Sequence, residues 1–255
     1  MLVIEHINLL TTLFFFVAIL YSTVGFGGGS SYIALLILMG VSHNLAPSMA
    51  LICNIIVVIG GTLHFLNKGT LSWKFISPFL FLSVPLAYVG GLISINKDVY
   101  QFILAIALFL AASRMLFLKN ASFQEKEHNK GPSKLLAMSI GGGLGFVSGL
   151  VGIGGGIFLA PIMYLCKWGS PKIIAATSSV FILINSIAGL VGQVQKTNGI
   201  ENLTPYLQLF VSVFLGGQIG SWLCNNRISY RKIEVLTSLL ILFVSIRLFS
   251  NVLII

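Results

Sequence analysis

The chain has 255 residues, of which 56% are hydrophobic and only 8% charged, and its formal net charge is +9 at pH 7. Soluble domains carry about 25% charged residues, so this composition excludes a water-covered globular domain and predicts a multi-pass protein embedded in the lipid bilayer. The basic residues lie in short loops between apolar segments, as the positive-inside rule describes. The charge therefore indicates topology, and no nucleic-acid partner is expected.

The predicted helices form the same series in each half of the chain. The first half has an apolar arm over residues 7–24, a shorter arm over 30–39, and longer segments at 45–66, 74–95 and 99–118. The second half repeats this order, with arms over 135–151 and 157–166 and segments at 172–195, 203–225 and 233–253. At 1.5 Å per residue the shorter arms give about 15 Å of helix, roughly half a bilayer, which predicts half-helices or the return limbs of re-entrant hairpins.

A glycine triplet joins the two arms in each half. The phrase Val-Gly-aromatic or aliphatic-Gly-Gly-Gly occurs at 24–29 and again at 151–156, and an alignment of the halves also matches Asn54 with Asn185. Repetition over about half the chain predicts two copies of one structural unit. We therefore expect an all-α protein with membrane repeats at 1–118 and 135–255, joined by a hydrophilic cytoplasmic linker at 119–134. Each repeat is expected to contain a glycine-broken, re-entrant helix pair and three transmembrane helices.

The basic residues discriminate between two topologies. If each triplet turns the chain back to the side it came from, 12 of the 15 Lys and Arg residues share one side of the membrane. A single crossing at each triplet would instead place about 9 of these basic residues on one side and 6 on the other. The positive-inside rule therefore favours the hairpin. Each half then makes an odd number of crossings, which predicts inverted repeats with both termini outside.

The glycine triplets are candidate binding sites for a small anion. Consecutive glycines let the chain turn and let a ligand approach the backbone, and the helix that follows presents free N–H groups and the positive end of its dipole. The alternative is that the glycines only permit tight helix packing. A separate pattern of small residues four apart, at Gly141, Gly145 and Gly149 with Ala18 and Ser22 as counterparts, predicts a packing seam. A nucleotide-binding loop is excluded, because no Lys-Ser/Thr follows either triplet.

Polar side chains in apolar helices are further candidates for the substrate path. Asn54 and Asn185 must find hydrogen-bond partners when buried, so they either form hydrogen bonds between helices or line the substrate path. Ser30 and Ser31 are expected either to contact the anion or to cap a helix, and the same alternatives hold for the hydroxyl cluster at 177–179. The predicted substrate-binding residues are Gly27, Gly28, Gly29, Ser30, Ser31, Asn54, Gly154, Gly155, Gly156, Thr177, Ser178 and Asn185.

The charged residues favour an anion over a cation as substrate. Every Asp and Glu is terminal or close to a loop, so a carboxylate-based proton relay or cation site at mid-membrane is not expected. The three cysteines stand singly without paired spacing, and neither a metal nor a cofactor is predicted. The roles of three residues stay open: His64 is interfacial or a proton relay, and Arg114 and Arg247 either snorkel or contact substrate.

Both glycine phrases resemble the signature of the TauE/SafE family, the sulfite-exporter-like permeases of bacteria and plants. The residues that carry the resemblance are 25–29, 148–156 with Pro161, 90–91, and 216–217 with Gly220. The resemblance implies a permease of the cytoplasmic membrane for small sulfur-containing anions such as sulfite, sulfoacetate or related organosulfonates. Ser30 and Ser31 stand where the second copy has Ile157 and Phe158, which predicts two half-sites that are not equivalent.

These features predict a secondary transporter, and not an enzyme, that exports a small sulfur-containing anion by alternating access. The membrane potential, negative inside, favours anion efflux by about 2.3 kcal/mol per charge per 100 mV, so export needs no elaborate coupling site. The alternative is a passive anion channel, in which the same glycines form a constriction. The sequence leaves the oligomeric state open, a homo-oligomer included.

Overall fold

The computed structural model describes residues 7–23, 25–117, 131–197 and 203–223, together with the single positions 242, 245, 246, 249 and 250. Every regular element in these ranges is a helix, as predicted. The helices are α2 (Ile7–Ser22), α3 (Gly29–Leu38), α4 (Leu45–Asn67), α5 (Trp73–Leu92), α6 (Lys97–Phe117), α7 (Lys134–Val151), α8 (Gly156–Leu165), α9 (Pro171–Lys196), the 3-10 turn η1 (Thr204–Tyr206) and α10 (Leu207–Leu223). The predicted helix at 233–253 and most of the linker at 119–134 lie outside the described residues.

The helix lengths confirm a membrane protein with long and short helices. Four helices, over Leu45–Asn67, Trp73–Leu92, Lys134–Val151 and Lys172–Lys196, are long and apolar enough to cross a bilayer. By contrast α3 and α8 have 10 residues each, which is about half the length that a bilayer requires. The division into half-length and full-length helices was therefore predicted correctly within the described ranges.

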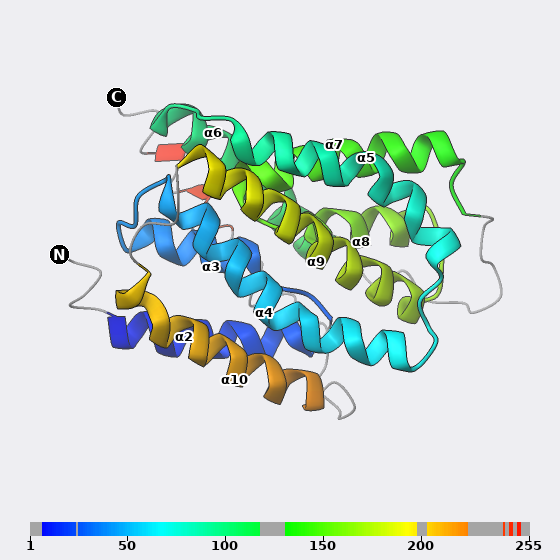
Figure 1. Cartoon of the computed structure of the whole chain (residues 1–255), viewed down its shortest axis with the longest axis horizontal. Coiled ribbons are helices and arrows are strands. Elements are labelled where there is room, and N and C mark those ends of the chain that lie inside the picture. Colours follow the sequence, from blue (N-terminus) through cyan, green and yellow to red (C-terminus); the bar gives the residue numbers. More distant parts are fainter. Residues whose placement is uncertain are drawn as a thin grey trace.

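The chain leaves the helical conformation at both glycine phrases. We call residues 25–28 the first glycine turn and residues 152–155 the second glycine turn. Gly25 and Gly28 have φ angles of 79° and 83°, and Gly152, Gly154 and Gly155 have φ angles of 88°, 86° and 73°, all in the left-handed region that favours glycine. In Figure 1, α3 runs back opposite to α2, and α8 runs back opposite to α7, so each turn reverses the chain.

Small residues bring α5 onto α7 and α2 onto α10. Gly141, Gly145 and Gly149 lie directly against backbone carbonyls of α5, at Phe79, Ser83 and Ala87 respectively, so there is no space for a Cβ on these glycines. On the other side of the molecule, Gly216 and Gly220 of α10 lie against the carbonyls of Phe15 and Ile19, while Ser22 Oγ donates a hydrogen bond of 2.6 Å to the carbonyl of Gly217. The predicted packing seam is confirmed.

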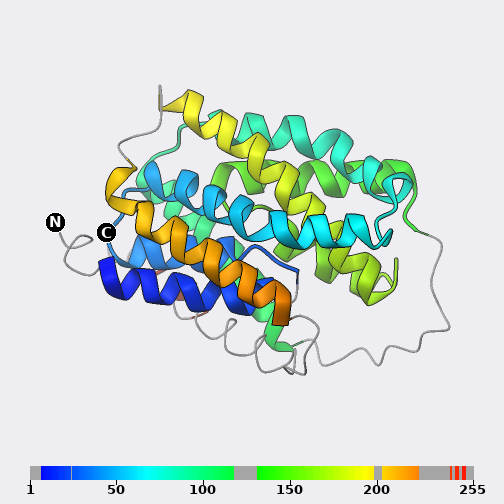
Figure 2. The ribbon, with the colours of Figure 1, turned by 60° about the horizontal axis from the view of Figure 1, so that its bottom comes forward.

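Two central helices, α4 and α9, cross in opposite directions between these pairs. Leu51, in the first half of α4, lies near Gly189 in the second half of α9, whereas Thr62, in the second half of α4, shares a hydrogen bond of 2.8 Å with Ser179 in the first half of α9. Helix α9 also packs on α5, and α4 packs on α10. In Figures 1 and 2 the long helices lie roughly along one axis, with α2 and α10 side by side.

The lysines divide unequally between the two ends of this bundle. Phe79 of α5 lies 6.3 Å from Trp168 in the α8–α9 loop, measured between ring centroids, so the α4–α5 loop, the start of α7 and the α8–α9 loop share one end. The lysines at this end are Lys68, Lys74, Lys134, Lys167 and Lys172. At the other end, where the Tyr88 hydroxyl donates a hydrogen bond of 2.5 Å to Gln195 Oε1, the described lysines are Lys97 and Lys196.

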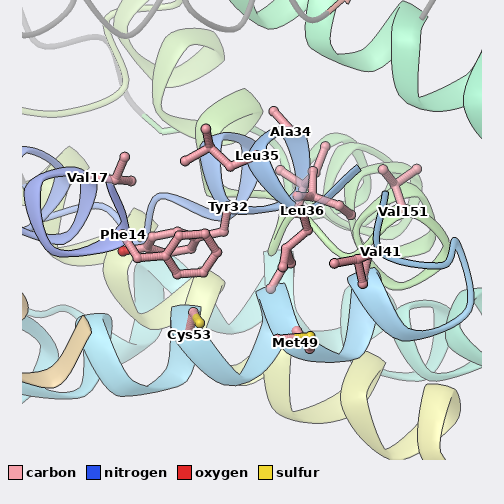
Figure 3. Packing of buried hydrophobic residues seen from close by; sticks show 14 of the residues in the cluster. Phe14, Val17, Tyr32, Ala34, Leu35, Leu36, Val41, Met49, Cys53 and Val151 are labelled. Atoms are coloured by element: carbon pink, nitrogen blue, oxygen red, sulfur yellow. The ribbon is translucent and has the colours of Figure 1, made fainter. Parts of the chain in front are cut away.

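The main hydrophobic core lies around α3, the shorter limb of the first hairpin. The rings of Phe14 and Tyr32 contact each other at a tilt of 34°, with centroids 4.8 Å apart, and Cys53 and Met49 of α4 lie below them in Figure 3. Val151, the last residue of α7, belongs to the same cluster. The core thus joins the first hairpin to the start of the second glycine turn.

Candidate substrate site between the two glycine turns

Asn54 brings the two glycine turns together. It lies near the middle of α4 and is fully buried, and its Nδ2 donates a hydrogen bond of 3.0 Å to the backbone carbonyl of Ile153 in the second turn. The same side chain fills the space beside Gly27 and Gly29, where a Cβ would overlap its amide. A Cβ on Gly154 would lie 2.6 Å from Asn54 Nδ2. One amide from the first half therefore touches both turns.

The predicted equivalence of Asn54 and Asn185 is wrong. In the second half, Gly154 and Gly156 pack on Ile182, as Gly27 and Gly29 pack on Asn54. Two serines before α4 and α9 give the same register. Ser42 Oγ accepts from Leu45 N–H ahead of α4, and Ser170 Oγ, 128 residues further on, accepts from Ile173 N–H at the start of α9. The counterpart of Asn54 is Ile182, and Asn185 lies three residues beyond it. The Nδ2 of Asn185 donates to the Phe181 carbonyl of its own helix, at 2.8 Å.

Backbone amides at both turns are available to a ligand. Within the described residues, the N–H groups of Gly27, Gly28, Gly29, Gly154 and Gly155 have no hydrogen-bond acceptor. These groups stand at the N-termini of α3 and α8, where the helix dipoles add positive potential. Free N–H groups at a helix N-terminus form a site that suits an anion.

Several buried side-chain oxygens around the turns also have no partner. Ser186 Oγ would lie 3.0 Å from a Cβ on Gly154, and Ser148 and Tyr32 pack against Gly155 and Gly28, respectively. The unpartnered buried oxygens are Tyr32 OH, Asn54 Oδ1, Ser148 Oγ, Ser178 Oγ, Asn185 Oδ1, Ser186 Oγ and Gln193 Oε1. Buried polar atoms are normally paired, so the oxygens that lie beside the free amides are candidate groups for binding a ligand.

Tyr32, Ser148 and Ser186 were not among the residues predicted from sequence. Ser186 lies four residues after Ile182 and therefore on the same face of α9, so the correct register would have pointed to it. Ser148 lies one turn before the second glycine turn and one residue before the seam position Gly149. Tyr32 follows the first triplet by three residues and carries an aromatic body, which hides its hydroxyl among the core residues.

Ser30 and Ser31 are buried beside the first turn but do not cap α3. The N-cap residue is Gly28, which has no side chain to donate or accept. The two hydroxyls instead lie 3.5 Å and 2.9 Å from the Tyr21 hydroxyl, respectively. Tyr21 therefore joins the end of α2 to the start of α3 across the hairpin and holds both serines near the free amides.

The hydroxyl cluster at 177–179 is not a helix cap either. Helix α9 begins at Pro171 with Ser170 as its N-cap, so Thr177 and Ser178 lie well inside the helix. Both are buried, and a Cβ on Gly156 would lie 3.2 Å from the Ser178 carbonyl. The third member, Ser179, is paired with Thr62. Of the two alternatives for this cluster, capping is wrong, and contact with the anion remains a prediction for Thr177 and Ser178.

The polar groups in the described interior are uncharged. Its buried polar side chains are Ser, Thr, Asn and Gln, together with the hydroxyls of buried tyrosines such as Tyr32. No three His, Cys, Asp or Glu residues in the described ranges come close enough together to hold a metal ion. The side chains of His64 and Arg114, and the whole of Arg247, lie outside the described residues. The site can therefore offer hydrogen bonds and helix dipoles to a small solute.

Known membrane proteins resemble this chain over most of its length. The family profile "Sulfite exporter TauE/SafE" matches residues 10–248. The chain is 34% identical over 238 residues to "Probable membrane transporter protein y4hK" of Sinorhizobium fredii, covering 92% of this chain and 95% of that protein. It is 23% identical to "Probable membrane transporter protein YunE" of Bacillus subtilis, covering 89% and 91% of the two chains. No solved structure matches.

A further relative is "Probable membrane transporter protein MJ0441" of Methanocaldococcus jannaschii, which is 24% identical over 248 residues, with 88% of each chain covered. The family match begins within α2 and spans both glycine turns and the other helices described above. The chain therefore belongs to the sulfite exporter TauE/SafE family and is a multi-pass membrane transporter, not an enzyme.

Proposed function

We propose that this protein exports a small sulfur-containing anion, such as sulfite or an organosulfonate, across the cytoplasmic membrane by alternating access. The observation that carries the proposal is the meeting of two helix-breaking turns at one buried amide, Asn54, with free N–H groups on both turns. Discontinuous helices whose N-termini face a common point are a recurrent way for transporters to bind anions. The family description and the names of the relatives agree with a transport role.

The proposed binding site combines backbone and side-chain donors. Its backbone part is the two triplets, Gly27 to Gly29 and Gly154 to Gly156. Its side-chain part is the set of buried polar residues that surround them, namely Ser30, Ser31, Asn54, Thr177, Ser178 and Asn185 from the sequence, with Ser186 added from the structure. Tyr21 positions the two serines of the first turn without itself belonging to the site.

We further propose that the halves are inverted repeats with both termini outside. The packing pairs support this, because α5 lies on α7 and α9 of the other half, and α10 lies on α2 and α4 of the other half. The opposite directions of α4 and α9 are what inversion requires. Five of the seven described lysines in loops and at helix ends share the end that holds the α4–α5 and α8–α9 loops, which under the positive-inside rule is the cytoplasmic end.

Burial of the site favours a carrier over a passive channel. Asn54, Ser178, Asn185 and Ser186 are all completely buried, and Ser30 and Ser31 are 1% exposed. A solute in this site would be closed off from both sides, so its release requires the helices to move. Single-channel recordings would separate the two mechanisms, since a carrier shows no unitary conductance.

Efflux from proteoliposomes tests the proposal. Vesicles loaded with labelled sulfite or methanesulfonate should lose label faster with the protein than without it, and Gly28→Leu and Gly155→Leu should abolish the difference. Both glycines have left-handed φ angles and close neighbours, so a leucine at either position distorts its turn. Normal flux in both variants would reject the turns as the site.

A further inference from the structure

We propose that the site between the glycine turns selects its substrate by charge. It binds oxyanions with one negative charge, such as hydrogensulfite and methanesulfonate, and rejects dianions such as sulfate and fully deprotonated sulfite. This inference rests on the proposed function and adds to it the form in which the substrate is carried.

The first argument comes from the absence of charge in the described interior. The buried polar side chains there are neutral, and the described lysines lie at the two ends of the bundle. The cost of removing an ion from water rises with the square of its charge, whereas its attraction to neutral dipoles rises only in proportion to the charge. Neutral donors therefore offset the desolvation of a dianion less fully than that of a monoanion, so this set of N–H and O–H donors favours a monoanion.

The second argument comes from the Asn54 oxygen. Because Asn54 Nδ2 donates to Ile153, the orientation of the amide is fixed, and its Oδ1 is turned towards Gly27. This oxygen is buried without a donor. It would repel an acceptor oxygen placed beside it, and sulfate has an oxygen on every side. Hydrogensulfite can instead donate its proton to Asn54 Oδ1, and a sulfonate can turn its uncharged alkyl group towards it.

The third argument comes from the unequal walls of the site. At the position where the second half has Ser186, the first half has Val58, whose Cγ2 would lie 2.9 Å from a Cβ on Gly27. Ile182 adds a second apolar side chain beside Gly154 and Gly156. An oxyanion group can therefore point to Ser186 and the free amides of the second turn while an uncharged end lies against Val58. In hydrogensulfite and small organosulfonates the charged oxygens lie on one side of the ion, whereas in sulfate they lie on every side.

The charge state of sulfite can be varied by pH without changing the protein. Initial flux of labelled sulfite into proteoliposomes would be measured below saturation, at one pH unit below and one above the pKa of hydrogensulfite. The singly charged fraction falls from about 0.91 to about 0.09, so the account predicts about tenfold lower flux at the higher pH. Methanesulfonate keeps one charge throughout, and its flux is expected to stay constant, which controls for any effect of pH on the protein. Sulfate flux is expected to equal that of empty liposomes.

A variant pair links this selectivity to the site. Ser186→Ala removes one donor to the oxyanion and should raise the KM for sulfite and for methanesulfonate about tenfold. Ser212→Ala is the control, since Ser212 is also a buried serine but donates to Leu209 within α10. An unchanged KM in Ser186→Ala would overturn the orientation proposed above.

The outcomes separate the two proposals. Sulfite flux that stays constant or rises with pH, or sulfate flux that matches methanesulfonate flux, would overturn charge selection while leaving anion transport intact. No flux of any of the three anions would contradict the proposed function and, with it, this inference.

Discussion

The side-chain amide of Asn54 donates a hydrogen bond of 3.0 Å to the backbone carbonyl of Ile153, 99 residues away in the chain. This bond joins the middle of α4 to the second glycine turn, and the same side chain lies against Gly27 and Gly29 of the first. A single residue thus fixes the distance between two segments that belong to different halves of the protein. The properties expected of the site depend on this contact.

Asn54→Leu should impair transport more than it impairs folding. The substitution leaves the Ile153 carbonyl without its donor in a buried place, which costs about 1–3 kcal/mol of stability. It also removes the amide that spaces the two turns, so we expect at least a tenfold loss of sulfite flux per folded molecule in proteoliposomes. Thr62→Val is the matched control, because it breaks another buried bond between α4 and α9, to Ser179, away from the turns. Equal flux in the two variants would contradict the role given to Asn54.

Alanine substitutions should distinguish the glycines of the turns from a glycine in a helix. In Gly29→Ala the new Cβ overlaps the Ile153 carbonyl and the Asn54 amide. In Gly154→Ala the new Cβ overlaps the Asn54 amide, and the alanine must also adopt a φ of 86°, which costs about 1–3 kcal/mol. Both variants should lose transport. Gly143→Ala has open space around its Cβ within α7 and should be neutral or more stable by about 0.5–1 kcal/mol. Full activity in Gly29→Ala would show that the close approach of the turns is unimportant.

The packing seam predicts a different kind of defect. In Gly145→Leu the side chain must displace the Ser83 carbonyl of α5, so the two helices separate and the melting temperature in detergent should fall. Overpacking of this kind costs about 1–3 kcal/mol. Gly143→Leu, which points away from other residues, should melt like the parent protein. A Gly145→Leu protein with unchanged melting temperature would argue against close α5–α7 packing.

The orientation in the membrane can be tested with single cysteines. Ser72 and Ser94 are exposed in the loops before and after α5, at opposite ends of the bundle. In a background without the three native cysteines, a membrane-impermeant maleimide added to intact cells should label Ser94→Cys and not Ser72→Cys. The reverse pattern would place the termini inside and overturn the orientation.

Much of the fold could be predicted from sequence because it depends on local signals. The length of apolar runs gave α4, α5, α7 and α9 to within a few residues, and the triplets marked the places where helices end. Glycines spaced by four likewise revealed the helix face that packs closely, as at Gly145 and Ser83. These signals need no knowledge of which distant segments meet.

The composition of the site could not be predicted in the same way. The alignment matched Asn54 with Asn185 because it paired like residues. In the structure the residue that packs on the second glycine turn as Asn54 packs on the first is Ile182, which is apolar. Sequence symmetry therefore missed Ser186, whose counterpart is Val58. The partners of Ser30 and Ser31 depend on how closely α3 folds back on Tyr21, which a linear pattern does not contain.

The most direct test is to locate a bound anion. Selenite is a close analogue of sulfite, and its singly charged form is hydrogenselenite. Crystals of the protein would be soaked in hydrogenselenite, and anomalous diffraction would locate the selenium atom. The account predicts a selenium peak between the turns, within about 4 Å of the Gly154 or Gly155 amides and of Ser186 Oγ. A peak only beside the lysines at the ends of the bundle, with none between the turns, would contradict it.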